Sequence, residues 1–455
     1  MERFLMKKLL DWKQSSRRKP LILSGIRKVG KTWLLKEFGN RHYGNVAYFN
    51  FDENEDFRQF FDSTHDVRRI LQNLMLASGQ RITPGETLII FDDIQDAPKV
   101  VNSLKYFCEN APEHHIACAS SLLGTAPALP SSFPVGNVNF LQIDPMTFSE
   151  FLLANGDEEL WRFTESIDQL EPIPDALFHP LCEKLKMFFV TGGMPESVQR
   201  WTRDRDVAAM QEALSDILHA HERDFAKHSD AKAFPKILKI WQSLPSQLAR
   251  ENKKFTYKAV KEGARAREYE GALQWLVDAR LVHKVYRSTA PGLPVAAHDD
   301  RSAFKIHLAD VGLLRRLARL APTAFGEGNR LFVEFEGALT ENFVLQTLMT
   351  QFEAPPRYWS QTNPPYEVDF LMQRENDIFP IEVQATGMAG SSKSRSLKKY
   401  KALFPDQTKL RVRFSLDNLK LDDDLLNIPL FLVDQTDRLI GLALKVRASK
   451  AADRG

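Results

Sequence analysis

Short apolar runs alternate with amphipathic segments along the first third of the chain. The runs occupy residues 21–24, 46–51, 87–91 and 115–119, and segments with helical periodicity lie between them. A short continuous apolar run is typical of a strand that is buried on both faces. Strands that alternate with helices pair in parallel through right-handed crossovers. The pattern therefore predicts an α/β fold in which helices cover both faces of a parallel sheet.

Beyond residue 148 the pattern changes twice. It is mainly helical to about residue 230, and it then shows short helices that end in a two-stranded signal. A helix, a turn, a second helix and a small wing is the simplest interpretation of residues 255–285, and such winged-helix units bind DNA or serve as protein contacts. From about residue 330 a helix and three strands indicate a second α/β unit. The predicted parts are 1–152 (first α/β domain), 153–230 (helical lid), 231–325 (winged-helix-like domain), 326–445 (second α/β domain) and 446–455 (flexible tail).

Length and composition are those of an ordinary soluble chain. At about 100–200 residues per domain, 455 residues correspond to roughly two to four domains. A formal net charge of +2 means that any nucleic-acid surface must come from local clustering. No apolar run reaches the ~18 residues of a membrane span, and charged residues follow Met1 too closely for a signal peptide. The three cysteines form no CxxC pair, so we expect no structural zinc. Together with the absence of an apolar span and of a signal peptide, this predicts a cytoplasmic protein without a membrane partner.

One glycine-rich segment follows the first predicted strand and opens a helix. Gly25-Ile26-Arg27-Lys28-Val29-Gly30-Lys31-Thr32 fits the pattern G-x-x-x-x-G-K-[ST]. In such a loop the glycines let backbone N–H groups turn toward phosphate oxygens, the lysine reaches the β- and γ-phosphates, and the hydroxyl binds Mg²⁺. The segment predicts a site for ATP and Mg²⁺. The residues expected to contact the nucleotide are Gly25, Arg27, Lys28, Val29, Gly30, Lys31, Thr32 and Trp33.

The third predicted strand ends on two acidic residues, Asp92 and Asp93. A carboxylate at the carboxyl end of a parallel strand near the phosphate loop can orient the Mg²⁺ shell, and we assign Asp92 to that role beside Thr32. The next acid commonly polarises the attacking water. Asp93 takes that position, with Gln95 as an alternative water-orienting group. Ser121, after the fourth strand, is a candidate for a polar contact near the γ-phosphate. The competing interpretation is that the acids cap a helix and that the serine forms a turn.

The order and spacing of these motifs resemble a widespread prokaryotic family of AAA-like ATPases whose members carry a C-terminal domain of unknown function with a restriction-nuclease-like end. The resemblance covers roughly residues 1–420. It implies a P-loop NTPase sheet, a helical and winged-helix middle, and a smaller nuclease-like α/β domain. Asp93 stands where the family commonly has Glu, which predicts slow hydrolysis. Besides Gly25–Thr32, the matching segments are Asp92–Gln95, Ser131–Gly136, Pro145–Leu152, Gly192–Glu196, Asp224–Phe225, Asp310–Leu314, Glu341–Asn342, Glu367–Phe370 and Pro380–Val383.

The C-terminal part contains acids in the spacing of a PD-(D/E)xK nuclease. Asp369 and Glu382 lie on two strands joined by a tight hairpin, and Glu341 lies on the preceding helix. Three carboxylates of this kind hold Mg²⁺ in such nucleases. That chemistry also needs a lysine two residues after the last acid, and this position is Gln384. We therefore predict a nuclease fold without cleavage activity, unless Lys393 or Lys398 substitutes. Weak metal binding and a purely structural role stay open.

Two clusters of basic residues are candidate nucleic-acid surfaces. The clusters lie around residues 253–267 and 393–401, and either is able to track phosphates if it is not simply a solvated face. Arginine-finger candidates are Arg223, Arg265 and Arg267, or a residue of another subunit if the protein is an oligomer.

The first hypothesis for the function of the chain is an ATP-driven switch that acts on DNA or a protein. The alternatives are an ATP-regulated nuclease and a nucleotide-stabilised interaction module with little turnover.

Overall fold

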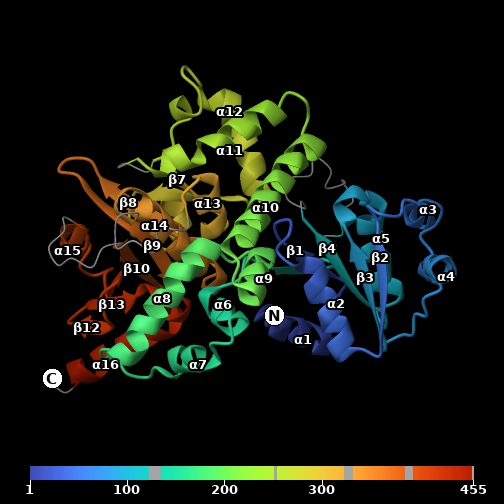
Figure 1. The fold of residues 1–455 in the computed structure, drawn as a ribbon, viewed down its shortest axis with the longest axis horizontal. Helices are drawn as coiled ribbons and strands as arrows, with labels where there is room; N and C mark the ends of the chain where they lie inside the picture. Colours follow the sequence, from blue (N-terminus) through green and yellow to red (C-terminus); the bar gives the residue numbers. More distant parts are fainter. Residues whose placement is uncertain (122–133, 135, 251–253, 322–331, 385–392, 453–455) are drawn as a thin grey trace.

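A computed structural model describes residues 1–121, 134, 136–250, 254–321, 332–384 and 393–452 of the chain. Its first 150 residues form a parallel sheet with the strand order β2-β3-β4-β1-β5 (Figure 1). Every neighbouring pair of strands is parallel. The strands are β1 (Leu21–Ser24), β2 (Asn45–Asn50), β3 (Thr87–Asp92), β4 (His115–Ser120) and β5 (Asn139–Gln142).

Two cores lie on opposite faces of this sheet because successive strand residues point to opposite sides. Leu21 and Leu23 of β1 pack in the core that contains the side chains of α1 and α2. Ile22 packs in the other core, with α3, α4 and α5. The predicted fold class, a P-loop NTPase sheet covered on both faces, is confirmed. The helices are α1 (Leu5–Gln14), α2 (Lys31–His42), α3 (Asp56–Asp62), α4 (Val67–Ser78) and α5 (Pro98–Asn110).

Five helices follow the sheet, in the segment where a helical pattern was predicted. The first begins with a capping box, in which the Thr147 hydroxyl accepts from the Glu150 backbone N–H and the Glu150 carboxylate accepts from the Thr147 N–H. Figure 1 shows α8 and α10 running between the two sheets of the molecule. These helices are α6 (Phe148–Ala154), α7 (Glu158–Ser166), α8 (Asp175–Thr191), α9 (Pro195–Asp204) and α10 (Val207–His228).

The remaining chain forms one mixed sheet of eight strands, ordered β12-β13-β11-β10-β9-β8-β6-β7. The segment predicted as a wing forms the β6–β7 hairpin, and its strand β6 pairs with β8. Residues 231–325 and 326–445 therefore share a sheet. The elements are α11 (Phe234–Leu248), η2 (Tyr257–Ala259), α12 (Ala266–Asp278), β6 (Val282–Ser288), η3 (Val295–His298), β7 (Asp299–Leu308), α13 (Val311–Leu317), α14 (Phe332–Gln351), β8 (Arg357–Gln361), β9 (Tyr366–Arg374), β10 (Asp377–Val383), α15 (Lys393–Leu403), β11 (Arg411–Ser415), β12 (Lys420–Asp422), β13 (Leu425–Pro429), η5 (Leu430–Gln435) and α16 (Thr436–Ala452).

Two segments differ from the sequence-based expectation. β5 was not predicted, because it is a partly exposed edge strand without a continuous apolar run. The helix α16 continues to Ala452, so residues 446–452, expected to be a flexible tail, are helical. Ser131–Phe133, Val135, Lys253 and the Lys393 side chain lie outside the described part of the chain. Within that part, no helix is long and apolar enough to cross a membrane.

Candidate nucleotide-binding site

The glycine-rich loop connects β1 to α2, where the sequence placed it. Gly30, the residue before α2, has φ +96°, a left-handed conformation that a residue with a side chain rarely adopts. A Cβ on Gly25 would lie 2.3 Å from the carbonyl oxygen of Ile143, the residue that follows β5. The two glycines of the motif are therefore required for different reasons. Gly30 turns the backbone into the helix, and Gly25 lets the loop pass close to the end of the sheet.

Lys31 lies beneath the loop and is only 7% exposed. Its ammonium donates to the carbonyl oxygens of Gly25 and Ile26, both at 2.9 Å. Burial lowers the pKa of this ammonium to about 8, although the carboxylates of Asp93 and Asp92 act in the opposite direction. A triphosphate in the loop would offer Lys31 charged oxygen acceptors, which bind an ammonium more strongly than peptide carbonyls do.

Asp92 and Thr32 face each other at the carboxyl end of the sheet. The Thr32 hydroxyl donates to Asp92 Oδ2 at 2.7 Å, and the Tyr48 hydroxyl donates to the same oxygen at 2.9 Å. A hydroxyl and a carboxylate so placed match the oxygen ligands that Mg²⁺ prefers beside a bound phosphate. Tyr48 was not predicted, since nothing next to it in the sequence marks it as functional. Its position on β2 brings it to the carboxylate.

The predicted catalytic residues Asp93, Gln95 and Ser121 lie together beyond Asp92. The Gln95 amide donates to Asp93 Oδ1 at 3.0 Å, and its carbonyl oxygen accepts from the backbone N–H of Ser121 at 3.4 Å and from the Ser120 hydroxyl at 3.2 Å. Gln95 thus connects the ends of β3 and β4. Asp93 has φ +55° and makes no side-chain cap to the following 3-10 turn. Burial raises the pKa of its carboxyl above the ordinary value, against the effect of the Gln95 bond.

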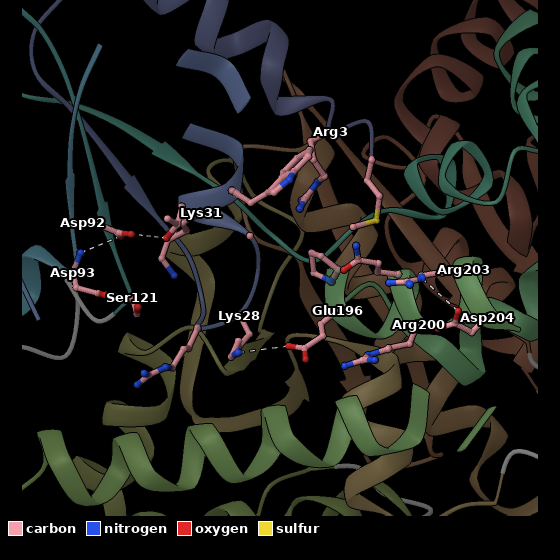
Figure 2. Close-up of a pocket in the computed structure, with 17 residues that line it drawn as sticks. Arg3, Lys28, Lys31, Asp92, Asp93, Ser121, Glu196, Arg200, Arg203 and Asp204 are labelled. Carbon is pink, nitrogen blue, oxygen red and sulfur yellow. Dashed lines mark hydrogen bonds and ion pairs between the residues drawn. The ribbon is translucent and has the colours of Figure 1, made fainter. Parts of the chain in front are cut away.

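A cavity of about 650 Å³ opens over these residues. Figure 2 shows one side formed by Lys31, Asp92, Asp93 and Ser121, and Glu196, Arg200 and Arg203 facing it from α9. Glu196, Arg200 and Arg203 recur at helical spacing, so they share one face of α9. Sequence reasoning missed this face, although the spacing directly after Gly192–Pro195 was visible. Trp33 also lines the cavity and is 41% exposed.

Ion pairs join the phosphate loop to the helices that cover it. Arg27 pairs with the largely buried Asp224 of α10, and Lys28 lies 3.6 Å from Glu196 of α9. Near the end of α10, Lys227 contacts Asp52 at 3.0 Å and Asp96 at 3.1 Å. Two residues of the loop that would meet phosphates are therefore engaged with carboxylates of the helical segment. A polyanion in the loop competes with these carboxylates for the same cations.

Arg3 holds the outer side of the loop and is 6% exposed. Its guanidinium donates to the carbonyl oxygens of Val29 at 3.1 Å and Asp144 at 2.6 Å, and to the Glu150 carboxylate at 3.2 Å. In a trans peptide the C=O and the following N–H point in opposite directions. By fixing the Val29 carbonyl, Arg3 fixes the direction of the Gly30 N–H. The predictions did not include Arg3, because its partners are far away in sequence.

The acids predicted as a nuclease-like site lie on α14 and on the neighbouring strands β9 and β10, where two cations lie close to acidic side chains. Val383 N–H donates to Asp369 at 2.8 Å, in the hairpin where Asp369 lies beside Glu382. Lys305 of β7, 1% exposed, pairs with Glu367 and lies 3.9 Å from Glu341. Burial opposes its charge, but the surrounding carboxylates outweigh burial and raise the pKa of the ammonium.

A second cation, Arg413, lies 3.7 Å from Glu382. Gln384 is buried after β10, in the position where the nuclease motif requires lysine. Within the described residues, no three His, Cys, Asp or Glu side chains are arranged to hold a metal ion. The acids predicted as a nuclease-like site are thus buried in a cluster that contains two internal cations.

Comparisons with protein families divide the chain into three matched segments. Residues 17–152 match an AAA domain, residues 182–324 match a domain of unknown function (DUF8612), and residues 336–433 match another (DUF4143). The first match covers the sheet and the glycine-rich loop, so the chain contains an AAA-type P-loop domain. No curated protein sequence matches the chain.

Comparison with solved structures finds several that are similar to parts of the chain. A Walker-type ATPase of Pyrococcus abyssi is 15% identical, with 70% of this chain and 95% of that chain covered and a TM-score of 0.43. The Orc1 protein of Aeropyrum pernix, solved in complex with DNA, is 14% identical over 70% of this chain and 91% of its own, with a TM-score of 0.28. The RuvB branch-migration motor of Thermotoga maritima is 13% identical over 63% and 90%, with a TM-score of 0.29. Similarities of this size say nothing about the substrates of this chain.

Proposed function

We propose that the protein is a Mg²⁺-dependent ATPase that works as a nucleotide-driven switch. The observation that carries the proposal is the hydrogen bond between Thr32 and Asp92 beside the loop that holds Lys31. Thr32 and Asp92 would hold Mg²⁺, which would neutralise phosphate charge during transfer to water. The backbone of the loop and Lys31 would hold the phosphates, and Arg200 of α9 would reach them from the opposite wall.

The groups beyond Asp92 suggest how water is activated. Asp93 has a raised pKa and therefore a more basic carboxylate, which suits a group that accepts a proton from water. Gln95 holds Asp93 and the start of the segment after β4 at fixed positions. Since Asp93 is one methylene shorter than glutamate, we expect turnover below the usual range of about 1–1000 per second.

The switch would act through the ion pairs between the loop and the helices. Arg27 is bonded to Asp224, and Lys28 lies near Glu196. Nucleotide phosphates that attract both cations weaken these pairs and free α9 and α10 to move. Both helices belong to the segment that leads to the second sheet, so the state of the nucleotide would be transmitted to the C-terminal half.

Two variants test the ATPase. Lys31→Ala should abolish ATP binding, because it removes the only buried ammonium that the described structure places in the loop. Asp92→Ala should keep measurable ATP binding without Mg²⁺ but lose turnover by at least about 100-fold. ATP binding is measured by titration with tryptophan fluorescence as the readout. A Trp33→Phe variant tests whether the fluorescence change comes from Trp33. Unchanged ATP affinity in Lys31→Ala would refute the proposal.

For the C-terminal module, we propose a nuclease-like fold without cleavage activity. The order α14-β8-β9-β10-α15-β11, with β10 parallel to β11, agrees with such a fold. Lys305 and Arg413 bring positive charge to the carboxylates that would otherwise attract Mg²⁺. We expect no cleavage of linear, supercoiled or single-stranded DNA with Mg²⁺ or Mn²⁺, with or without ATP. Cleavage that disappears in Asp369→Ala would favour an ATP-regulated nuclease instead.

A further inference from the structure

The segment from α11 to β7 has the element order of a winged helix-turn-helix unit. The helix α11 is followed by a short extended stretch that pairs with β7 through the Phe255 N–H and the Phe304 carbonyl at 2.9 Å. The turn η2 and the helix α12 come next, and the β6–β7 hairpin closes the unit. In units of this kind the second long helix enters the major groove of duplex DNA with its N-terminal residues toward the bases.

This segment is much more basic than the rest of the chain. Residues 231–280 contain 11 Lys and Arg and 5 Asp and Glu, a formal charge of +6, whereas the whole chain carries +2. The remaining residues therefore carry a net negative charge. A local excess of this kind is the electrostatic signature of a phosphate-binding surface in a protein whose overall charge is near zero.

The excess is concentrated at the exposed end of α12. Lys258 and Lys261 lie on and just after η2, and Arg265 and Arg267 lie at the start of α12; all four are exposed. None of the four makes an ion pair in the described part of the chain, unlike most cations around the nucleotide cavity. The positive end of the α12 dipole points the same way.

Acidic residues reduce this charge only in part. Glu270 is held by Lys284 at 2.9 Å and by the Tyr257 hydroxyl, and the pKa of its carboxyl is lowered: burial opposes the shift, but these two bonds outweigh it. Glu262 and Glu268 are exposed beside the four cations. Four unpaired cations against two unpaired acids leave a positive surface at the edge of the molecule, where Figure 1 shows α12.

The wing packs partly against neighbouring strands of its own sheet. Val295, in the hairpin loop, is 3% exposed and packs in the cluster of Trp359 and Val368. Its backbone N–H donates to Gln373 of β9 at 3.1 Å. Val295 of the wing is therefore held against β8 and β9, and α12 and the turn before it are the elements that we expect to contact a partner.

We propose that η2 and the N-terminal half of α12 bind duplex DNA, with Lys258, Lys261, Arg265 and Arg267 on its phosphates and groove edges. This inference names the partner for the switch proposed above and rests on that function. The C-terminal half of α12 supports a link between this DNA surface and the nucleotide site. Gln274, Val277 and Asp278 line a groove of about 580 Å³ that is also lined by Gly25 and Ser121 of the nucleotide domain. One helix thus extends from the basic surface to the edge of the phosphate loop, and DNA on its exposed end would bias the nucleotide site.

Fluorescence anisotropy with a labelled duplex of about 30 base pairs tests the surface. We expect the full-length protein to bind the duplex at low salt, with an affinity that falls steeply as salt rises. Arg265→Ala/Arg267→Ala should weaken binding at least about tenfold and reduce the slope of log Kd against log salt by about 2, because each phosphate contact contributes about 0.9. The charge control is Arg162→Ala/Lys186→Ala, which removes the same charge from partly exposed, ion-paired side chains on α7 and α8.

The outcomes separate this inference from the proposed ATPase. Each preparation is also titrated with ATP, and both double variants should retain wild-type ATP affinity, because none of the four substituted residues, the finger candidates Arg265 and Arg267 included, lines the nucleotide cavity. If ATP binds but the wild-type protein does not bind duplex at 50 mM salt, the DNA assignment is overturned and the ATPase stands. An equal loss of duplex binding in both double variants would indicate attraction by overall charge and would also overturn it. Stimulation of ATP turnover by duplex in the wild type, lost in Arg265→Ala/Arg267→Ala, would show that duplex bound at this surface acts on the nucleotide site.

Discussion

At the scale of single residues, Lys31 decides how ATP binding depends on pH. The pKa of its buried ammonium is about 8 in the free protein. Bound phosphates stabilise the ammonium and raise this pKa, so binding takes up a proton wherever free Lys31 is neutral. ATP affinity should therefore be constant below pH 8 and fall by up to about tenfold per pH unit above it. Calorimetry from pH 7 to 9.5, in buffers of different ionisation enthalpy, measures both the ATP affinity and the number of protons taken up on binding.

A matched variant shows whether Lys31 is the group that causes the pH dependence of ATP affinity. Lys31→Arg keeps a positive charge over the whole range, since a guanidinium does not titrate below pH 12. Its affinity will be lower because the longer side chain does not fit the bonds to Gly25 and Ile26. Its pH dependence, however, should disappear. A wild-type affinity that stays constant to pH 9.5 would show that the ammonium is not neutralised in the free protein.

At the scale of elements, the N-terminal segment before α1 contributes to the nucleotide site through Arg3. Arg3→Ala removes three buried bonds and frees the Val29 carbonyl. Buried bonds to charged groups contribute about 1.5–3 kcal/mol each, so both stability and ATP affinity should decrease. We expect KM for ATP to rise about tenfold with a smaller change in kcat, because the direction of the Gly30 N–H affects binding most.

Control variants distinguish an effect of Arg3 on the position of the phosphate loop from an effect on the stability of the whole protein. Arg17→Ala removes an exposed arginine of the same region and should leave KM unchanged. Arg3→Lys retains a charge for Glu150 but cannot make all three bonds, so its KM should lie between those of the wild type and Arg3→Ala. If Arg3→Ala lowers the melting temperature while KM stays at the wild-type value, Arg3 is structural only.

The same elements show which parts of the site the sequence predicts. The loop from Gly25 to Thr32 is continuous in sequence, and its chemistry follows from residue type and order, so it was predictable. Tyr48 and Arg3 come from separate segments and reach the site only through strand pairing and docking of α1. Lys305 is the clearest case, because no local pattern links a residue of β7 to acids on α14 and β9. β5 was missed because an exposed edge strand carries no apolar signal.

At the scale of the whole molecule, Asp310 joins the helical segment to the second half of the chain. Its carboxylate accepts from the N–H of Gly193, two residues before α9, at 2.6 Å and from the N–H of Leu313 in α13 at 2.9 Å. A Cβ on Gly193 would lie 2.2 Å from the carbonyl oxygen of Met146, so the junction has no spare space. The turn that positions α9 over the nucleotide cavity is thus held from both sides, by the segment after β5 and by the residue after β7. In the switch proposed above, movement of the second sheet would reach the cavity wall through this junction.

This junction makes stability depend on pH in an unusual direction. Burial raises the pKa of Asp310 to about 6, against the backbone bonds that lower it, while the unfolded value is 3.8. Between these values the folded state binds more protons than the unfolded state, so stability falls as pH rises. Asp310→Asn removes this titration. The unfolding free energy of the wild type minus that of Asp310→Asn should decrease by about 3 kcal/mol between about pH 3 and pH 7 and be flat above pH 7. Denaturant unfolding at matched salt measures the difference, and a difference that rises with pH would mean that the backbone donors outweigh burial.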